Sequence, residues 1–360
     1  MSEAIGGYIS GGKFSMLWDG QSVDLDHFTG VGAVAALEKR LAEFYGLKHA
    51  ICMASATSAL FSIGLALGLQ GADFLTSPLN FGGSITPWLL LGNRPIFADV
   101  DRVTLTLDPF HVEQCLVTRK TRAILAVDLH GYPSDTVGLR RVAEDLGLWY
   151  IADAAQAFGA TRGGLPASYM ADAVVLSFNS QKSLPAGEGG CIITDNTDLY
   201  ERLIWCSQHP LRQKRELGLC IHNEFSFNSR IHPAAAVSAL ATFDRALQLV
   251  TEYQDLCFEA LTMLESERLI ESAGLSNSEI RPSFFAVTAN PTGEMDHCVD
   301  CLYHHGIEAS THDYLSSVLY KNPVYLQQFG KQHQHKNRCT AAEEAVTRMT
   351  LSSLRRTRTI

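Results

Sequence analysis

The chain has 360 residues, of which 46% are hydrophobic and 19% charged, a balance typical of globular proteins and unlike disordered chains. Its formal net charge of −9 argues against binding to nucleic acid or to an anionic membrane surface. The longest apolar stretch, around residues 88–91, is too short to span a bilayer, and the N-terminus lacks a signal-peptide pattern. We therefore expect a soluble, intracellular protein with one large domain and one smaller domain.

The cysteines favour a reducing environment. Nine are spread along the chain without a repeating pattern, and this odd number predicts free thiols in a cytoplasmic protein. Cys298 and Cys301 form a single CxxC pair, which is short of the four ligands of a structural zinc site. We expect no metal centre.

The first predicted elements form an anion-binding arrangement. Residues 1–30 are glycine-rich and are interpreted as an arm, and a helix with apolar spacing follows at 34–44. A strand at 50–54 then runs into Ser55, Ala56, Thr57 and Ser58, with a further helix behind them. The free amides at a helix start attract anions, and hydroxyl groups add donors. The alternative is a plain N-cap formed by Ser55 or Thr57.

Strands and helices continue to alternate. Apolar runs predict strands at 74–77, 95–100, 123–128, 149–153, 173–176 and 191–194, with helical patterns between many of them, as at 137–146. This order predicts a mostly parallel sheet with helices on both faces, and such sheets bind ligands at the carboxyl ends of their strands. We expect four groups to converge there: Ser55 with Thr57, Phe81, Asp153 and Lys182.

Lys182 lies in the segment SFNSQKSLPAGEGG, residues 177–190, between two predicted strands. An amine in a glycine-rich loop between strands is typical of a lysine that forms a Schiff base, although a surface lysine in a turn has the same appearance.

The second half of the chain has a different pattern. A long helix is predicted at 233–266, followed by a strand at 283–289 and a helix at 296–304. We therefore divide the chain into an arm (1–30), a large domain (31–235) and a small α+β domain (236–360). The loop 208–224 carries basic groups that either meet an anion or are simply solvated: His209, Arg212, Lys214 and Arg215. The C-terminal sequence LRRTRT is interpreted as a solvated tail.

The four converging groups match the needs of pyridoxal phosphate (PLP). Ala56, Thr57 and Ser177 would bind its phosphate, and Phe81 would stack on its ring. Asp153 would keep the pyridine nitrogen protonated, and Lys182 would bind the aldehyde and later move a proton. Each also has a simpler interpretation: Phe81 as a core residue, Asp153 as a helix cap and Ser177 as a turn residue.

The sequence resembles the DegT-type sugar and aminocyclitol aminotransferases from about residue 30 to about residue 308. The phosphate turn of that family is matched by SATSAL (55–60), its aromatic position by NF (80–81), and its acidic motif by IADAAQAFGA (151–160). Its lysine motif is matched by SFNSQKSLPAGEGG and its GYNYRM segment by FSFNSRI (225–231). The resemblance implies two further cofactor contacts, Gln156 near the ring hydroxyl and Asn228 donated by a neighbouring subunit.

The resemblance also implies a fold and an activity. It implies the α/β fold-type-I architecture and a homodimer whose active sites are shared. It further implies transfer of an amino group from glutamate or glutamine to a keto-sugar or keto-cyclitol through Lys182. Ala56 replaces a family glycine, which requires a negative φ at that position. The alternatives are a PLP-dependent lyase acting on an amino acid, and a PLP-binding regulatory protein without turnover.

Overall fold

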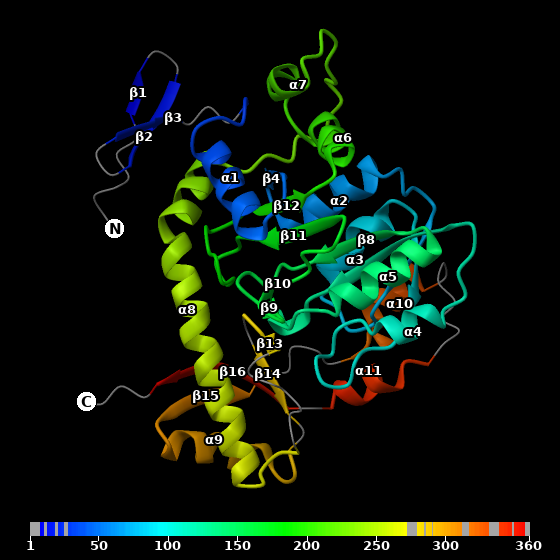
Figure 1. Ribbon diagram of the computed structural model, residues 1–360, viewed down its shortest axis with the longest axis vertical. Helices are drawn as coiled ribbons and strands as arrows, with labels where there is room; N and C mark the ends of the chain where they lie inside the picture. Colours follow the sequence, from blue (N-terminus) through cyan, green and yellow to red (C-terminus); the bar gives the residue numbers. More distant parts are fainter. Residues whose placement is uncertain are drawn as a thin grey trace.

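The computed structural model describes residues 8–10, 13–18, 21–24, 28–271, 279–283, 286–289, 291–311, 317–330, 338–347 and 349–356. Its centre is a seven-stranded sheet in the order β4-β12-β11-β8-β7-β5-β6 (Figure 1). The strands are β4 (His49–Met53), β5 (Asp73–Thr76), β6 (Arg94–Phe97), β7 (Thr121–Val127), β8 (Trp149–Asp153), β11 (Ala173–Ser177) and β12 (Gly190–Thr194). Only β12 is antiparallel to its neighbours within this sheet, and the predicted mostly parallel sheet is confirmed.

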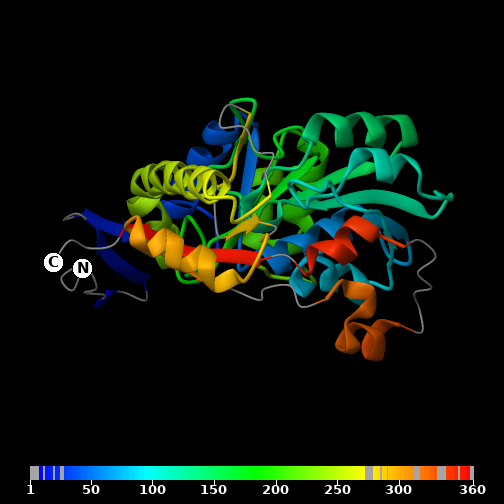
Figure 2. The ribbon, with the colours of Figure 1, turned by 90° about the horizontal axis from the view of Figure 1, so that it is seen from below.

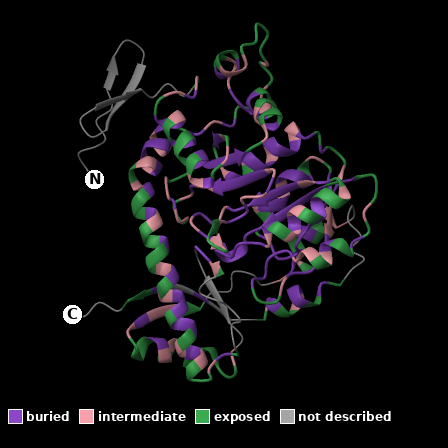
Figure 3. Cartoon of the chain, in the orientation of Figure 1, coloured by how far each residue is buried: buried purple, intermediate pink, exposed green. Residues whose placement is uncertain are grey.

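Successive side chains of each strand point to opposite faces of the sheet, and they pack into two cores, one on each face. In β4, Ala50 and Cys52 pack into one core, whereas Ile51 and Met53 pack into the other. Burial on both faces explains the continuous apolar runs in the sequence, and every strand of this sheet except the edge strand β6 is buried almost throughout (Figure 3).

Helices cover both faces of the sheet. The first core includes residues of α1 (Ala33–Tyr45), α5 (Thr136–Leu146) and the N-terminal half of α8 (Pro233–Ser266). The second includes residues of α2 (Ala56–Ala66), α3 (Gly82–Leu90) and α6 (Thr197–Ser207). Shorter helices are α4 (Pro109–Glu113) and α7 (Pro210–Leu217).

A smaller sheet, β14-β16-β15, packs against the C-terminal half of α8 and against α9 (Met295–His304). Its strands are β14 (Ala286–Ala289), β15 (Ile307–Thr311) and β16 (Met349–Arg356). The interpretation of LRRTRT as a solvated tail is therefore wrong for Leu354, Arg355 and Arg356. They belong to the central strand of this sheet, and Leu354 is buried.

The segment between β15 and β16 packs on the large sheet. It includes α10 (Pro323–Phe329) and α11 (Thr340–Ala345), whose buried residues join the second core. Asp99, beyond β6, accepts hydrogen bonds from the amides of Ala341 and Ala342, both at 2.9 Å. Figure 2 shows this segment beneath the large domain, away from α9.

Two further small sheets complete the fold. The backbone of β1 (Tyr8–Ser10), β2 (Lys13–Trp18) and β3 (Gln21–Asp24) forms an antiparallel sheet near the N-terminus. The strands β9 (Thr161–Arg162), β10 (Leu165–Pro166) and β13 (Ile280–Arg281) join the chain after α8 to the large domain.

Candidate active site

The start of α2 is built as an anion site. Ser55 caps the helix: its Oγ accepts from the Ser58 amide at 3.1 Å, and the Ser58 hydroxyl accepts from the Ser55 amide at 3.0 Å. The amides of Ala56 and Thr57, the first two of the helix, have no acceptor within the helix, as an anion site requires. Ala56 lies within the helix and is not among the residues with positive φ. Its backbone therefore has the negative φ that alanine requires in place of the family glycine.

Gly190 holds the phosphate turn against the lysine loop. A Cβ added to Gly190 would lie 2.5 Å from the Ala56 nitrogen and 2.8 Å from the Leu176 carbonyl oxygen. Gly190 also pairs in register with Ser177, so Ser177 ends its strand beside the same turn. The Ser177 hydroxyl accepts from the Asn179 amide at 3.4 Å.

The substitution Gly190→Ala tests this contact. Because the new methyl group would push on backbone atoms of the turn, we expect PLP affinity to fall about tenfold or more, as for a lost hydrogen bond to a charged group. The measurement is a titration of apoprotein with PLP, followed by absorbance. Gly293→Ala is the control, since its Cβ would meet nothing within 4 Å and its φ is not positive. An equal loss in both variants would contradict the proposed contact.

Asp153 and Lys182 interact electrostatically, Asp153 at the end of β8 and Lys182 in the loop after the neighbouring strand β11. Asp153 closes β8 and is 4% exposed, with its Oδ1 accepting from the Ala155 amide at 3.1 Å. Burial raises the pKa of Asp153, whereas hydrogen bonds from Ser84 and Ala155 and the charge of Lys182 oppose that rise. Burial lowers the pKa of Lys182, and Asp153 counters this in part. The amine is therefore deprotonated more easily than an exposed lysine, as a nucleophile requires.

Phe81 presents its ring at the start of α3. It is 58% exposed, unlike the core residue of the simpler interpretation. A Cβ on Gly83 would lie 2.8 Å from the Phe81 ring and 3.2 Å from the Thr57 hydroxyl oxygen, so the starts of α2 and α3 converge. An exposed aromatic face beside an anion site is suited to stacking on a planar ring.

Gln156 is buried near Asp153, and its side chain is fixed. Its Oε1 accepts from the His130 amide at 2.7 Å. Its backbone carbonyl accepts from the hydroxyl of Ser283 at 3.0 Å. The Ser183 hydroxyl donates to the Ser283 carbonyl at 3.4 Å, which connects this group to the lysine loop.

Asn228 precedes Ser229 and Arg230, whose backbone pairs with the end of β4. It is exposed, has φ of 61°, and its Oδ1 accepts a hydrogen bond from Arg230. Within the described part of this single chain, the partner of its side chain is thus Arg230 and not a residue of the crevice.

Sequence reasoning missed three contributors: Ser84, Gly190 and Ser283. Gly190 ends the segment SFNSQKSLPAGEGG and Ser84 follows the NF pair closely, so the signal was a polar or small residue near a named one. Ser283 lies 100 residues from Ser183, and no local pattern joins the two.

A cleft of about 1270 Å³ opens beside the lysine loop. One wall contains Lys182 and Ser183, and the other is formed by α8 and by the small sheet, including Arg245, Tyr253 and Arg355. The cleft offers space for a substrate next to the amine.

Neither a metal site nor a membrane span emerges from the described residues. Among them, no cluster of three or more His, Cys, Asp or Glu side chains could hold a metal ion. No helix within that part of the chain is both long and apolar enough to cross a membrane.

The model of the DegT/DnrJ/EryC1/StrS aminotransferase family matches residues 21–356. This chain belongs to that family. It is 36% identical over 179 residues to the spore coat polysaccharide biosynthesis protein SpsC of Bacillus subtilis, a stretch covering 49% of this chain and 46% of SpsC. It is 29% identical over 265 residues to a UDP-2-acetamido-2-deoxy-3-oxo-D-glucuronate aminotransferase of Pseudomonas aeruginosa, covering 73% and 70% of the two chains. The stretch matched to SpsC thus spans about half of the length of SpsC.

Solved structures share the fold. NtdA of Bacillus subtilis, determined with bound cofactor PMP, superposes with a TM-score of 0.72 at 25% identity, over 91% of this chain and 73% of NtdA. The predicted family, fold class and cofactor are therefore confirmed, because the family and its solved members are PLP-dependent aminotransferases.

The residues present fit PLP. A helix start with free amides and hydroxyls suits its phosphate, a buried carboxylate suits its pyridine nitrogen, and a lysine with a lowered pKa suits its aldehyde.

Proposed function

We propose that the chain is a PLP-dependent aminotransferase that moves an amino group from glutamate or glutamine to a keto-sugar or keto-cyclitol. The observation that carries this proposal is the electrostatic interaction of the half-buried Lys182 amine, in the loop after β11, with the buried Asp153 carboxylate at the end of β8. Bound PLP would supply an electron sink for the bonds at the amino carbon.

Each candidate residue has a role in this proposal. Ala56 and Thr57 bind the phosphate through their amides, with Ser177 beside them, and Phe81 covers one face of the ring. Asp153 keeps the pyridine nitrogen protonated, and Gln156 orients the ring hydroxyl. Lys182 would hold the aldehyde of the cofactor, and its Nζ would move a proton between the amino-bearing carbon of the substrate and the cofactor.

Relatives support the class of acceptor. The Pseudomonas relative is named as acting on a 3-oxo sugar nucleotide, and SpsC is named as a polysaccharide biosynthesis protein. The cleft beside Lys182 has room for a sugar-sized acceptor. A cyclic ketone carrying hydroxyl groups is therefore the acceptor we propose.

The test is the first half-reaction. Purified protein loaded with PLP is mixed with L-glutamate or L-glutamine, and 2-oxo acid and pyridoxamine phosphate are measured. We expect both products in equal amounts with at least one of the two donors. Pyruvate and ammonia from other amino acids would instead indicate a lyase. A protein that binds PLP but reacts with no donor would be the regulatory alternative.

We also propose a homodimer with shared active sites. The segment before Asn228 exposes apolar side chains, with Ile221 80% and Phe225 95% exposed. Such groups on one segment are typical of an interface with another chain. In the proposed dimer, a second copy covers them, and Asn228 reaches the phosphate of that copy.

A mixed-dimer experiment tests this arrangement. Lys182→Ala and Asn228→Ala chains are each expected to lose most activity as homodimers. When they are unfolded and refolded together, half of the dimers are mixed, and each contains one complete site. We expect recovery of about a quarter of wild-type activity, because a two-fold dimer exchanges Asn228 reciprocally. Absence of recovery, or a monomer by light scattering with full PLP occupancy, would exclude the shared site.

A further inference from the structure

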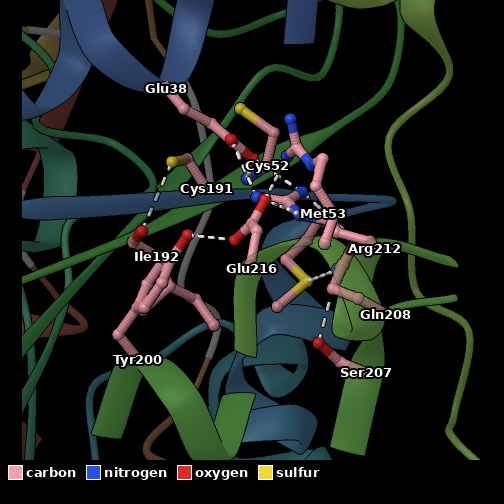
Figure 4. A network of polar contacts seen from close by, with 11 residues as sticks. Glu38, Cys52, Met53, Cys191, Ile192, Tyr200, Ser207, Gln208, Arg212 and Glu216 are labelled. Atoms are coloured by element: carbon pink, nitrogen blue, oxygen red, sulfur yellow. Dashed lines mark hydrogen bonds and ion pairs between the residues drawn. The ribbon is translucent and has the colours of Figure 1, made fainter. Parts of the chain in front are cut away.

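A buried ion network lies beside the end of β4 (Figure 4). Its centre is Arg212 on α7, whose side chain is 2% exposed. Arg212 Nη2 lies 2.9 Å from Glu38 Oε2 on α1, and its Nε lies 2.9 Å from Glu216 Oε1. The interpretation of Arg212 as a loop residue available to an anionic ligand is therefore wrong, because both sides of its guanidinium are paired inside the protein.

The network is tightly enclosed. Gly30 has φ of +67°, and a Cβ on it would lie 2.8 Å from Arg212 Cδ and Nε. Burial raises the pKa of Glu38, whereas the charge of Arg212 opposes this rise. The Tyr200 hydroxyl donates to Glu216. Since a buried charge without its partner is costly, each group depends on the others.

Glu38 and Gln208 connect this network to the phosphate turn. Glu38 Oε1, which accepts from Arg212 Nη1 at 3.0 Å, also accepts from the Cys52 amide at 2.7 Å. Arg212 Nη1 donates to Gln208 Oε1 at 3.3 Å, and Gln208 Nε2 contacts Met53 Sδ at 3.5 Å. Cys52 and Met53 are the last residues of β4, directly before the turn that starts α2.

The same strand end holds the segment that carries Asn228. The Ala54 amide donates to the Ser229 carbonyl at 3.2 Å, and Met53 forms an antiparallel bridge with Arg230. The Ser229 amide in turn donates to the Ser207 carbonyl at 2.8 Å, next to Gln208. The end of β4 therefore touches the Arg212 network on one side and the Asn228 segment on the other.

We propose that Arg212 is a positioning residue that contributes to two active sites at once, its own subunit's and the neighbouring subunit's. Through Glu38 and Gln208 it fixes the end of β4, and thereby both the phosphate turn of its own subunit and the Asn228 side chain offered to the neighbouring subunit. This inference rests on the proposed PLP-dependent function and on the shared dimer site. Arg212 itself touches neither cofactor nor substrate.

The substitution Arg212→Lys tests the first half of the proposal. Lysine keeps the charge but loses the planar fork that pairs with two carboxylates. The matched control is Arg140→Lys, since Arg140 pairs with Asp172 at 3.0 Å in a partly buried site near the start of β8. For each holoenzyme, stability to urea and affinity for pyridoxamine phosphate are measured separately.

We expect Arg212→Lys to weaken pyridoxamine phosphate binding about tenfold or more, as for a lost hydrogen bond to a charged group. Arg140→Lys should bind as wild type even where it loses as much stability. If Arg212→Lys fails to fold, Glu38→Gln takes its place, because it weakens the same pair and keeps an oxygen for the Cys52 amide. Wild-type affinity in a folded variant, or equal losses in Arg212→Lys and Arg140→Lys, would overturn the proposal.

Hybrid dimers test the second half. One chain carries Arg212→Lys with Lys182→Ala, and its tagged neighbour is wild type, so that the one working site has an intact phosphate turn. Because only the site that keeps Lys182 turns over, the activity is measured against pyridoxamine phosphate concentration, and we expect the concentration for half-maximal activity to rise relative to a hybrid carrying Lys182→Ala alone. Equal half-maximal concentrations would refute the action across the interface. A wild-type protein that binds no cofactor would instead refute the proposed function itself.

Discussion

Replacing Lys182 by alanine is expected to abolish amino transfer while the protein stays folded. Lys182 is only partly exposed and interacts with Asp153, and burial lowers the pKa of its amine. The loop around it is held by its own backbone, as the Lys182 amide donates to the Asn179 carbonyl at 2.9 Å. Removing the side chain should therefore remove chemistry and leave the loop in place. The turnover rate should fall at least about 10²–10⁴-fold, the range typical of a lost general acid–base group.

Two variants sharpen that experiment. Lys182→Arg keeps a positive charge but has a pKa too high for a nucleophile, so it should be as inactive as the alanine variant. Lys48→Ala removes a lysine that pairs at the surface with Asp195 at 3.2 Å, and it should keep full activity. Turnover is measured with PLP-saturated protein, and the fold is checked by circular dichroism. Substantial activity in Lys182→Ala would exclude the assigned role.

Asp153→Asn is expected to slow the reaction about 10²–10³-fold, as for the loss of one preorganised electrostatic contact. The carboxylate is buried and fixed by Ser84 and by the Ala155 amide, so it stays aimed at one atom of the ligand. Asparagine preserves the shape but cannot keep the pyridine nitrogen protonated. The cofactor should still bind, because the phosphate turn and Lys182 are intact. Single-turnover kinetics with glutamate measures the loss.

Asp128→Asn is the matched control for Asp153. Asp128 lies on the neighbouring strand end, is fully buried, and accepts hydrogen bonds from Ser134 and Ser168. Burial raises its pKa to about 6, despite those hydrogen bonds. Its substitution should alter stability and leave the single-turnover rate near that of wild type. Similar rate losses in both variants would mean that any buried carboxylate at this edge matters, and that Asp153 has no special role.

The sequence was sufficient to predict the large sheet and the residues at its strand ends. Strands such as β8, predicted and found at 149–153, have short apolar runs whose side chains are buried on both faces, and this is a local signal. Asp153 ends one such strand and Lys182 lies in the loop after another, so the parallel order brings them to one edge of the sheet.

Contacts between distant segments could not be predicted in this way. Arg212 stands in a run of charged residues, which indicates a solvated loop, yet its partner Glu38 lies 174 residues away on α1. Leu354 precedes basic residues, which indicates a tail, yet its strand pairs with β14 and β15. Burial of these groups depends on the surfaces that other elements present, and periodicity along the chain does not record this.

The identity of the lysine that binds the cofactor tests the account most directly. Protein loaded with PLP is treated with borohydride, which fixes the cofactor covalently to that lysine, and the modified peptide is mapped by mass spectrometry. We expect one modified site, Lys182, in the peptide that contains SFNSQKSLPAGEGG. Modification at another lysine, or absence of a fixed cofactor in protein that contains PLP, would contradict it.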